Sequence, residues 1–480
     1  MGLYGPEVQN DAVTRPSKPV CHHPSMGAVS SLPPGPRLPR IVQTLGFIVS
    51  PARYMSWARR RYGDVVTMST MFDPRFVMVY DPEAVKQVFQ GPPEQLRAGE
   101  ANALLGPILG ERSVLVLDGD EHIRQRRLML PAFHGRRMKA YESIMREATD
   151  REIDSWPVGE PFELLPSMQA LTLDVIMRAV FGVEEGRRYT DLHRALREMI
   201  APISRPVSMI ALMMLFDRSG RRGSRRLREF EERRERVDSL IFDEIARRRE
   251  VADLAEREDV FSTLLLARDE DDRPMTDQEI RDELVPLLVA GHETTATGLA
   301  WTFDLLLHDE RVRTRALAAV AEGDDGYLDA VAKESLRIRP VIPGIGRKVR
   351  GAPFELRGYT IPPGVEINPS IVMLHARADS YPGPRDFRPE RFLEESPPDT
   401  YTWIPFGGGV RRCIGASFAL FEMRVVIRRV LERAALAAIE TERDTVERRG
   451  ITLVPKRGVR VRQTRPARAA SDPVRAAQAA

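Results

Sequence analysis

Apolar residues recur every three or four positions over most of the chain, the spacing that puts them on one face of a helix. This pattern dominates from about residue 120 onward, and the first predicted element begins at Pro51. The predicted helices cover residues 51–61, 81–90, 120–130, 136–155, 166–181, 187–200, 224–250, 276–308, 326–339 and 413–433. In the long helix 276–308, Thr276 followed by Glu279 predicts a capping box at the N-terminus.

Strand signals are few and short. Apolar runs between turn residues predict strands at residues 65–70, 76–80, 354–359 and 365–368. This balance predicts a mainly α fold with small β-sheets. Residues 31–465 contain no internal repeat and no clear linker, which favours one large domain over several small ones. Residues 1–30, with the Cys21-His22-His23 triplet, and residues 466–480 are expected to be disordered tails.

Charge and cysteine content narrow the class of protein. The 72 Lys and Arg residues and 69 Asp and Glu residues leave a net charge of +3, which gives no case for nucleic-acid binding. Two cysteines exclude a disulfide framework and a four-cysteine metal site within this chain. No apolar run approaches the ~18 residues of a membrane span, the longest being 41–49 and 207–216. The first 30 residues lack the apolar segment of a secretory signal, so we expect a cytoplasmic protein.

The most informative segment lies around Cys413. Gly407, Gly408 and Gly409 let the backbone turn tightly and approach a flat partner closely. Because a predicted helix follows and two arginines precede Cys413, the helix dipole and the positive charge are expected to favour its thiolate form. A single thiolate behind a glycine-rich loop, with Arg411 able to meet carboxylates, is typical of an axial metal ligand. The alternative is a small buried cysteine in a glycine-rich turn.

The middle of helix 276–308 carries a second candidate site. Ala290 and Gly291 are small residues that allow close approach, and Glu293 and Thr294 put an acid next to an alcohol inside an apolar run. Such a pair can relay protons to a ligand derived from dioxygen. The alternative is a threonine that bonds back to the Ala290 carbonyl, with Glu293 simply exposed.

Together these motifs resemble the cytochrome P-450 family of haem-thiolate monooxygenases. The family's haem-loop pattern F-x-x-G-x-R-x-C-x-G is matched at Phe406, Gly409, Arg411, Cys413 and Gly415. Its distal-helix pattern, a small residue, a glycine, any residue, an acid and a threonine, is matched at residues 290–294. The resemblance covers about residues 31–465 of the chain.

Two weaker motifs of the same family lie between the helix and the loop. Glu334 and Arg337 match its E-x-x-R motif. The same motif recurs elsewhere in this Arg-rich chain, so this pair is chosen only because it lies on a predicted helix before the Cys413 loop. Arg391 lies in a match to the family's P-E-R-F segment. By the resemblance, these three residues form a buried ion-pair network with a folding role rather than a catalytic one.

The resemblance implies haem b, iron protoporphyrin IX, held between the long distal helix and the proximal cysteine loop. Cys413 would be the iron ligand, Glu293 the acid of the proton relay, and Thr294 the residue that orders the hydrogen bonds around bound oxygen. The other implied cofactor contacts are His122, Arg126, Ala290, Gly291, Arg347, Phe406, Gly407, Arg411 and Gly415.

The same resemblance implies a reaction and its partners. One oxygen atom of O2 would be inserted into a lipophilic small molecule by hydroxylation or epoxidation. The chain carries no flavin, nicotinamide or iron–sulfur fingerprint, so a separate ferredoxin or flavodoxin with its reductase is implied. The basic residues expected to steer such a donor are Arg124, Arg127, Arg136, Arg137, Lys139 and Arg412.

Several alternatives stay open at this point. Residues 97–116 and 201–216 fall where the family's substrate pocket varies, and the apolar part of 201–216 is either core or a surface that touches a membrane. A monomer is expected. The rival functions are a peroxygenase driven by peroxide and a haem-binding sensor or carrier without turnover. The acid–alcohol pair argues against both, because neither requires a proton relay.

Overall fold

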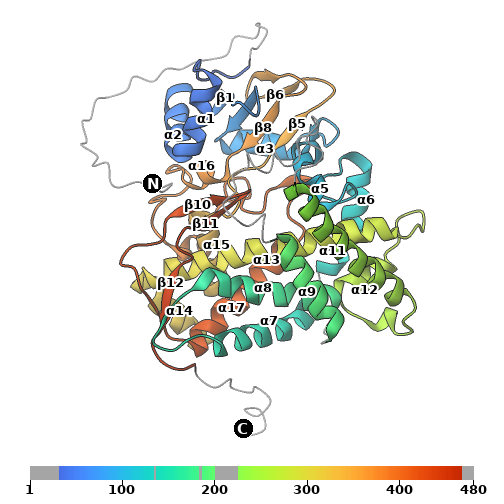
Figure 1. Cartoon of the computed structure of the whole chain (residues 1–480). Coiled ribbons are helices and arrows are strands. Elements are labelled where there is room, and N and C mark those ends of the chain that lie inside the picture. The colour runs from blue at the N-terminus through green and yellow to red at the C-terminus, as the bar shows by residue number, and fades with distance from the viewer. Residues whose placement is uncertain (1–31, 134–136, 183–185, 201–224, 468–480) are drawn as a thin grey trace.

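The computed structural model describes residues 32–133, 137–182, 186–200 and 225–467, and helices dominate them (Figure 1). The helices are α1 Arg40–Val49, α2 Pro51–Tyr62, α3 Pro82–Gln90, α4 Ala98–Ala101, α5 Gly106–Leu109, α6 Gly119–Met129, α7 Arg137–Asp154, α8 Leu164–Phe181, α9 Arg187–Ile200, α11 Arg225–Arg249, α12 Val260–Leu266, α13 Asp277–Leu307, α14 Glu310–Glu322, α15 Asp325–Ile338, α16 Ile371–His375 and α17 Ala416–Arg433. The strands are β1 Val65–Met68, β2 Phe76–Val79, β3 Leu96–Arg97, β4 Pro161–Glu163, β5 Arg347–Val349, β6 Phe354–Leu356, β7 Tyr359–Ile361, β8 Glu366–Pro369, β9 Leu436–Ala438, β10 Val446–Arg449, β11 Thr452–Pro455 and β12 Arg460–Gln463. The predicted fold class, mainly α with small sheets, is confirmed.

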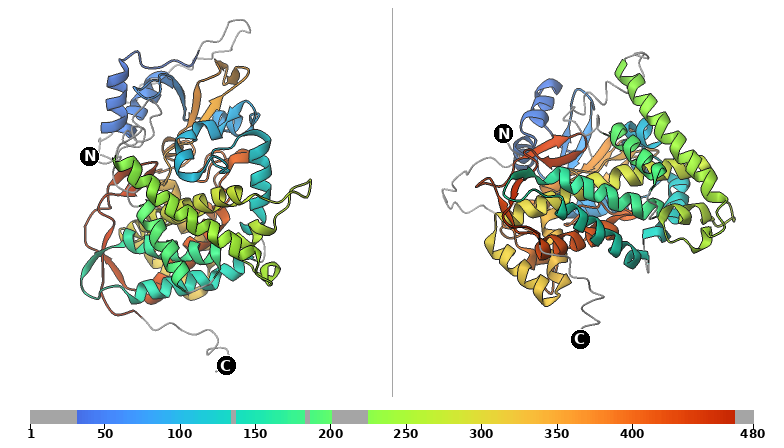
Figure 2. Two further views of the ribbon diagram at one scale, coloured as in Figure 1. Left: turned by 45° about the vertical axis from the view of Figure 1, so that its right-hand side comes forward. Right: turned by 60° about the horizontal axis from the view of Figure 1, so that its bottom comes forward.

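Helix α13 runs through the middle of the helical part of the molecule (Figure 1, Figure 2). It packs along α8 and also contacts α15 and α17. Its N-terminus carries the predicted capping box, because the Glu279 N–H donates to Thr276 Oγ1 at 3.2 Å and the Thr276 N–H donates to Glu279 Oε2 at 2.7 Å. The long distal helix predicted at residues 276–308 is therefore confirmed.

A five-stranded sheet of order β1-β2-β8-β5-β3 forms the main β part, beside α1, α2 and α3 at the top of Figure 1. Strand β2 pairs antiparallel with β1 and parallel with β8, and β5 pairs antiparallel with both β8 and β3. A buried face of Val77, Val79, Ile367 and Val349 joins these strands to α3. Because β5 is paired on both sides, the sheet fixes the position of Arg347, the first residue of that strand.

Several predicted boundaries are wrong. The chain folds into α1 before Pro51, and α14 and strands β9 to β12 were not predicted. The single strand predicted at 354–359 is a hairpin of β6 and β7, because Arg357 and Gly358 have φ values of 52° and 80° and reverse the chain. These elements are short or carry mixed charge, so their apolar periodicity is weak.

The sequence predicts no segment that is long and apolar enough to span a membrane. One helix of the structure does meet these two conditions. Helix α8 is 18 residues long with a mean hydropathy of 1.3, but 67% of it is buried inside the structure. It is mostly apolar because it packs between α13, α7 and α12. We therefore interpret α8 as a core helix.

Some predicted features lie outside the described residues. These are most of the two predicted tails with the Cys21-His22-His23 triplet, the pocket segment 201–216, and Arg136 of the donor patch. The backbone of Arg137 begins α7, but its side chain is not described.

Candidate active site around Cys413

The Cys413 loop has a conformation that its glycines permit. Gly407 and Gly409 have φ values of +69° and +63°, in the left-handed region that side chains other than glycine rarely adopt. A Cβ added at Gly408 would lie 2.1 Å from the Phe89 ring, and one at Gly409 would lie 2.2 Å from the Phe89 carbonyl oxygen. The loop is thus pressed against the end of α3.

Cys413 itself lies just before α17. Its N–H donates to the Phe406 carbonyl oxygen at 2.9 Å, and its sulfur accepts from the Gly415 N–H. Solvent reaches the side chain, although protein atoms crowd around the thiol. This burial raises the pKa of the thiol, and the Gly415 N–H, Arg126 and Arg412 oppose the rise only in part.

The arginine and the N–H at the start of the helix do favour the thiolate of Cys413, as predicted, but the net pKa of the thiol is raised. Desolvation of the thiol outweighs the nearby positive charge and the single N–H donor. A metal ion deprotonates a thiol that coordinates it. A metal ion bound at Cys413 would therefore restore the thiolate form.

Four side chains expected to meet the haem carboxylates gather from separate elements. His122 and Arg126 come from α6, Arg347 from β5, and Arg411 from the turn before Cys413. Burial, reinforced by Arg411, Arg126 and Arg347, lowers the pKa of His122 to about 3. The pKa of Arg347 falls to about 10 because the side chain is buried and Arg411 is near. Burial also lowers the pKa of Arg411 to about 10.

Asp118 offsets part of this positive charge. Its carboxylate accepts a hydrogen bond from Arg411, and it also accepts the Gly99 and Glu100 N–H groups at 2.9 Å each. Arg411 further donates to the Leu117 carbonyl oxygen at 2.6 Å. Asp118 thus fixes the direction of the Arg411 side chain.

The segment before α6 joins the Cys413 loop to α13. At one end, Arg411 donates to the Val114 carbonyl oxygen at 3.2 Å. At the other end, the Val114 N–H donates to Glu283 Oε1 at 2.8 Å and the Arg112 N–H to Asp282 Oδ2 at 2.9 Å. Carboxylates of α13 therefore hold one wall of the site.

The residues around Cys413 fit a haem group. Arg126, Arg347 and Arg411 leave positive charge that Asp118 only partly offsets. The buried His122 Nδ1 has no hydrogen-bond partner among the residues that the structure describes. A buried polar atom without a partner destabilises the fold, and two propionate carboxylates would supply the acceptors and the negative charge that this cluster lacks.

On α13, Thr294 and Ala290 lie one turn apart. The Thr294 hydroxyl donates to the Ala290 carbonyl oxygen at 2.7 Å, which is the back-bonding geometry of the simpler interpretation. A Cβ added at Gly291 would lie 3.1 Å from two carbon atoms of Ile176 in α8. The small residue at position 291 therefore lets α13 and α8 pack closely.

Glu293 points toward α8 and is not simply exposed. Its Oε2 accepts from Gln169 Nε2 at 2.7 Å, and His292 Nε2 lies 3.8 Å away. Burial lowers the pKa of His292. Neighbours on a helix differ by about 100° in direction, so Glu293 and Thr294 lie on different faces. Among the described contacts, no hydrogen bond joins the two side chains.

Glu334, Arg337 and Arg391 lie in one buried ion-pair network. Arg337 binds Glu334 through two hydrogen bonds of 2.7 Å, and Arg391 Nε lies 3.1 Å from Glu334 Oε1. The Arg388 N–H donates to the same oxygen at 3.1 Å. The side chains of the first three residues are 0 to 4% exposed. The network joins α15 to the turn Pro389–Phe392.

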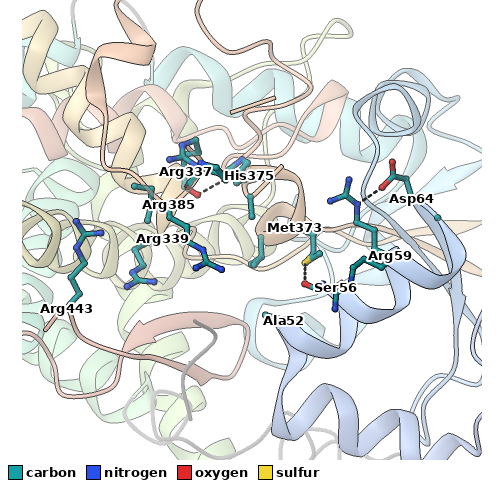
Figure 3. A pocket seen from close by; sticks show the side chains of 16 residues that line it. Ala52, Ser56, Arg59, Asp64, Arg337, Arg339, Met373, His375, Arg385 and Arg443 are labelled. Atoms are coloured by element: carbon teal, nitrogen blue, oxygen red, sulfur yellow. Dashed lines mark hydrogen bonds and ion pairs between the residues drawn. The ribbon is translucent and has the colours of Figure 1, made fainter. Parts of the chain in front are cut away.

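His375 connects this network to the Cys413 loop. Figure 3 shows its ring beside Arg337, whose guanidinium donates to the His375 carbonyl oxygen at 2.9 Å. Burial, helped by Arg337, lowers the pKa of His375 to about 3, so the ring is neutral. The Ile404 N–H donates to Nε2 at 3.0 Å, and Nδ1 therefore donates to the Arg337 carbonyl oxygen at 3.2 Å. Ile404 in turn accepts the Gly407 N–H at 3.0 Å.

Phe406 packs against another ring, and the basic residues predicted to steer the electron donor are partly paired with acids. The Phe406 ring packs edge-on against Trp403 at 6.0 Å. Arg124 is paired with Asp269 and Glu279, and Arg127 is paired with Glu270. Arg412 and Lys139 are exposed. The described part of the patch therefore offers fewer uncompensated charges than the sequence predicts.

Sequence reasoning missed four residues that shape the site: Phe89, Asp118, Gln169 and His375. Each acts through a contact between segments far apart in the chain, so no local motif indicates it. Asp118 lies four residues before His122. An acid so close to the predicted propionate contacts is a sequence signal that points to Asp118 as part of the site.

Comparison with known proteins gives consistent matches. Residues 33–460 match the family model described as Cytochrome P450. The chain is 41% identical to "Putative cytochrome P450 135B1" of Mycobacterium tuberculosis over 437 residues, 90% of this chain and 91% of that protein. It is 36% identical to "Putative cytochrome P450 137" of the same species, over 91% of this chain and 92% of that protein.

Two solved structures share the fold. The haem domain of cytochrome P450DA superposes with a TM-score of 0.78 at 24% identity, covering 92% of this chain and 99% of that one. Cyanobacterial CYP120A1 with bound retinoic acid gives a TM-score of 0.75 at 23% identity, covering 90% of this chain and 99% of that one.

Replacing Glu334 tests the buried network. Glu334→Gln leaves the guanidiniums of Arg337 and Arg391 buried without their carboxylate, so the free energy of unfolding should fall by about 3–5 kcal/mol. Glu394→Gln is the control, because Glu394 is 50% exposed and pairs with the exposed Arg388, and its loss should cost about 1 kcal/mol or less. Thermal unfolding compares the two variants, and equal midpoints for both would contradict the assigned role.

Proposed function

The chain belongs to the cytochrome P450 family, and from that premise we propose that it oxidises a lipophilic small molecule with O2 and electrons from a separate protein. Members of this family are haem-thiolate monooxygenases, and their cofactor is haem b. The observation that carries the proposal is the Cys413 loop, which lies beside a buried cluster of arginines whose charge Asp118 offsets only in part.

We assign the haem contacts from these surroundings. Cys413 would be the axial ligand of the iron. His122, Arg126, Arg347 and Arg411 would receive the propionates, because the positive charges of the arginines lie close together and the Nδ1 of the neutral His122 lacks a partner among the described residues. Haem b, when bound, supplies the iron at which dioxygen is reduced.

The closeness of Gly408 and Gly409 to α3 supports a further assignment. These two glycines let the loop lie against Phe89, so its backbone does not obstruct a planar ligand on its other side. Phe406 and Gly415 would frame the loop, and Ala290 would form the small-residue surface of α13 that faces the cofactor, while the neighbouring Gly291 lets α13 pack against Ile176 of α8.

The proton path of the proposal begins at Thr294. Its hydroxyl donates to the Ala290 carbonyl oxygen and can still accept a hydrogen bond at its own oxygen. To pass on a proton received from water, Thr294 must turn its own O–H away from the Ala290 carbonyl and toward the proton acceptor. Glu293 is held by Gln169, so it must release that hydrogen bond before it supplies protons toward Thr294. Gln169 is thus a positioning residue for the acid.

The electron donor would be an acidic ferredoxin or flavodoxin that docks beside the Cys413 loop. Arg412 is exposed and lies next to Cys413 in the chain. Lys139 and Arg127 are exposed as well, although Arg127 already pairs with Glu270. Opposite charge on the donor would raise the rate of encounter more than the strength of the final complex.

Replacing Thr294 tests the proton path. Thr294→Ala removes the hydroxyl, so we expect product formed per electron to fall by about tenfold or more, with hydrogen peroxide released instead. Thr294→Ser keeps the hydroxyl and should retain most of the coupling. The assay uses the haem-loaded enzyme with a ferredoxin and its reductase, and fatty acids, terpenoids and steroids as substrates. Normal coupling in Thr294→Ala would contradict the assignment.

Replacing Arg412 tests the docking face. Arg412→Glu should slow reduction of the enzyme by an acidic ferredoxin by roughly tenfold at low salt, and the difference should shrink as salt screens the charges. Arg194→Glu makes the same charge change on α9, where Arg194 is 54% exposed. Stopped-flow reduction compares the variants. An equal effect of both would show that the overall charge, rather than this face, governs the rate.

A further inference from the structure

A cavity of about 860 Å³ lies away from the Cys413 site, between α2 and the C-terminal end of α15 (Figure 3). Small-molecule sites in proteins are typically about 300–1,000 Å³. Ala52, Ser56 and Arg59 of α2 lie on one side of the cavity (Figure 3). None of the residues assigned above as haem contacts or to the proton path lines it.

Guanidinium groups dominate the polar part of this lining. The cavity is lined by Arg59, Arg60, Arg337, Arg339, Arg385 and Arg443, whereas Asp64 is the carboxylate among its lining residues. Figure 3 shows Arg339, Arg385 and Arg443 together on the side opposite α2. They come from three separate segments, the end of α15, the turn before Asp386 and the turn between β9 and β10.

Some of these arginines already have partners. Arg59 pairs with Asp64 at 2.5 Å, and Arg337 belongs to the buried Glu334 network. The Arg339 guanidinium lies over the Trp301 ring at 4.9 Å. These contacts fix the positions of Arg59, Arg337 and Arg339 in the walls of the cavity.

Arg385 and Arg443 differ from them. Within the described part of the chain, neither side chain forms an ion pair or a hydrogen bond. Burial and the nearby Arg339 lower the pKa of Arg443, although Asp304, Asp309 and Asp386 act in the opposite direction. The carboxylates near Arg443 therefore offset the positive charge at this wall only in part, and none of them forms a described ion pair with Arg385 or Arg443.

The lining also has an apolar part formed by Ile338, Val372 and Met373. Guanidinium groups bind phosphate through paired hydrogen bonds, and a planar or apolar group gains from contact with such a wall. We propose that this cavity binds a small organic phosphate, with its phosphate groups on Arg385 and Arg443 and its apolar part against the Ile338 wall. The concave shape favours a small molecule over a protein segment. This proposal does not rest on the proposed function.

The test measures binding of two probes, adenosine triphosphate and inorganic pyrophosphate, to the haem-loaded enzyme by isothermal titration calorimetry. The double variant Arg385→Gln/Arg443→Gln should bind adenosine triphosphate on the order of tenfold more weakly than wild type, or worse. The control Arg228→Gln/Arg236→Gln removes the same two charges from exposed positions on α11, on the far side of Figure 1 from α2. It should bind as wild type does. An unchanged haem spectrum in both variants shows that they are folded.

Three results would overturn the proposal. The wild type fails to bind either probe, the two double variants weaken binding equally, or the cavity variant binds adenosine triphosphate as tightly as wild type. Equal affinity of the wild type for both probes would overturn the organic part, because the apolar wall would then contribute nothing.

Discussion

The buried carboxylate of Glu334 is the interaction on which the geometry of the site depends. It is fully buried, and the guanidiniums of Arg337 and Arg391 neutralise it. Arg337 also binds the backbone of His375, whose neutral ring joins the Arg337 carbonyl to the Ile404 N–H. This chain of contacts reaches from α15 to the start of the Cys413 loop. A buried ion pair is weak evidence for stability in general, but removal of one partner strands the others.

Two electrostatic imbalances of opposite sign lie next to each other around Cys413. Burial raises the pKa of the thiol, whereas a neighbouring cluster of His122, Arg347 and Arg411 is depleted of negative charge. A haem carries a metal cation at its centre and carboxylates at its edge. One group would therefore correct both imbalances, which accounts for a buried thiol next to crowded arginines.

How much could be predicted from the sequence depends on whether a residue acts locally or across the fold. The apolar periodicity, the Cys413 loop and the motif at residues 290–294 are local patterns, and the fold class follows from the first and the family from the other two. The pKa of Cys413 was predicted in the wrong direction, because desolvation depends on surrounding atoms that no motif records. The direction of Glu293 toward Gln169 and the link through His375 are set by helix packing between distant segments. Such contacts become visible only once α8, α13 and α15 are placed in space.

The central claim is that Cys413 binds haem iron as a thiolate. The carbon monoxide difference spectrum of the reduced, purified protein tests it most directly. A haem held by the Cys413 thiolate should give a strongly red-shifted Soret band, which is lost when Cys413 is replaced by alanine. An unshifted band in the wild type, or a protein that binds no haem, would contradict the account.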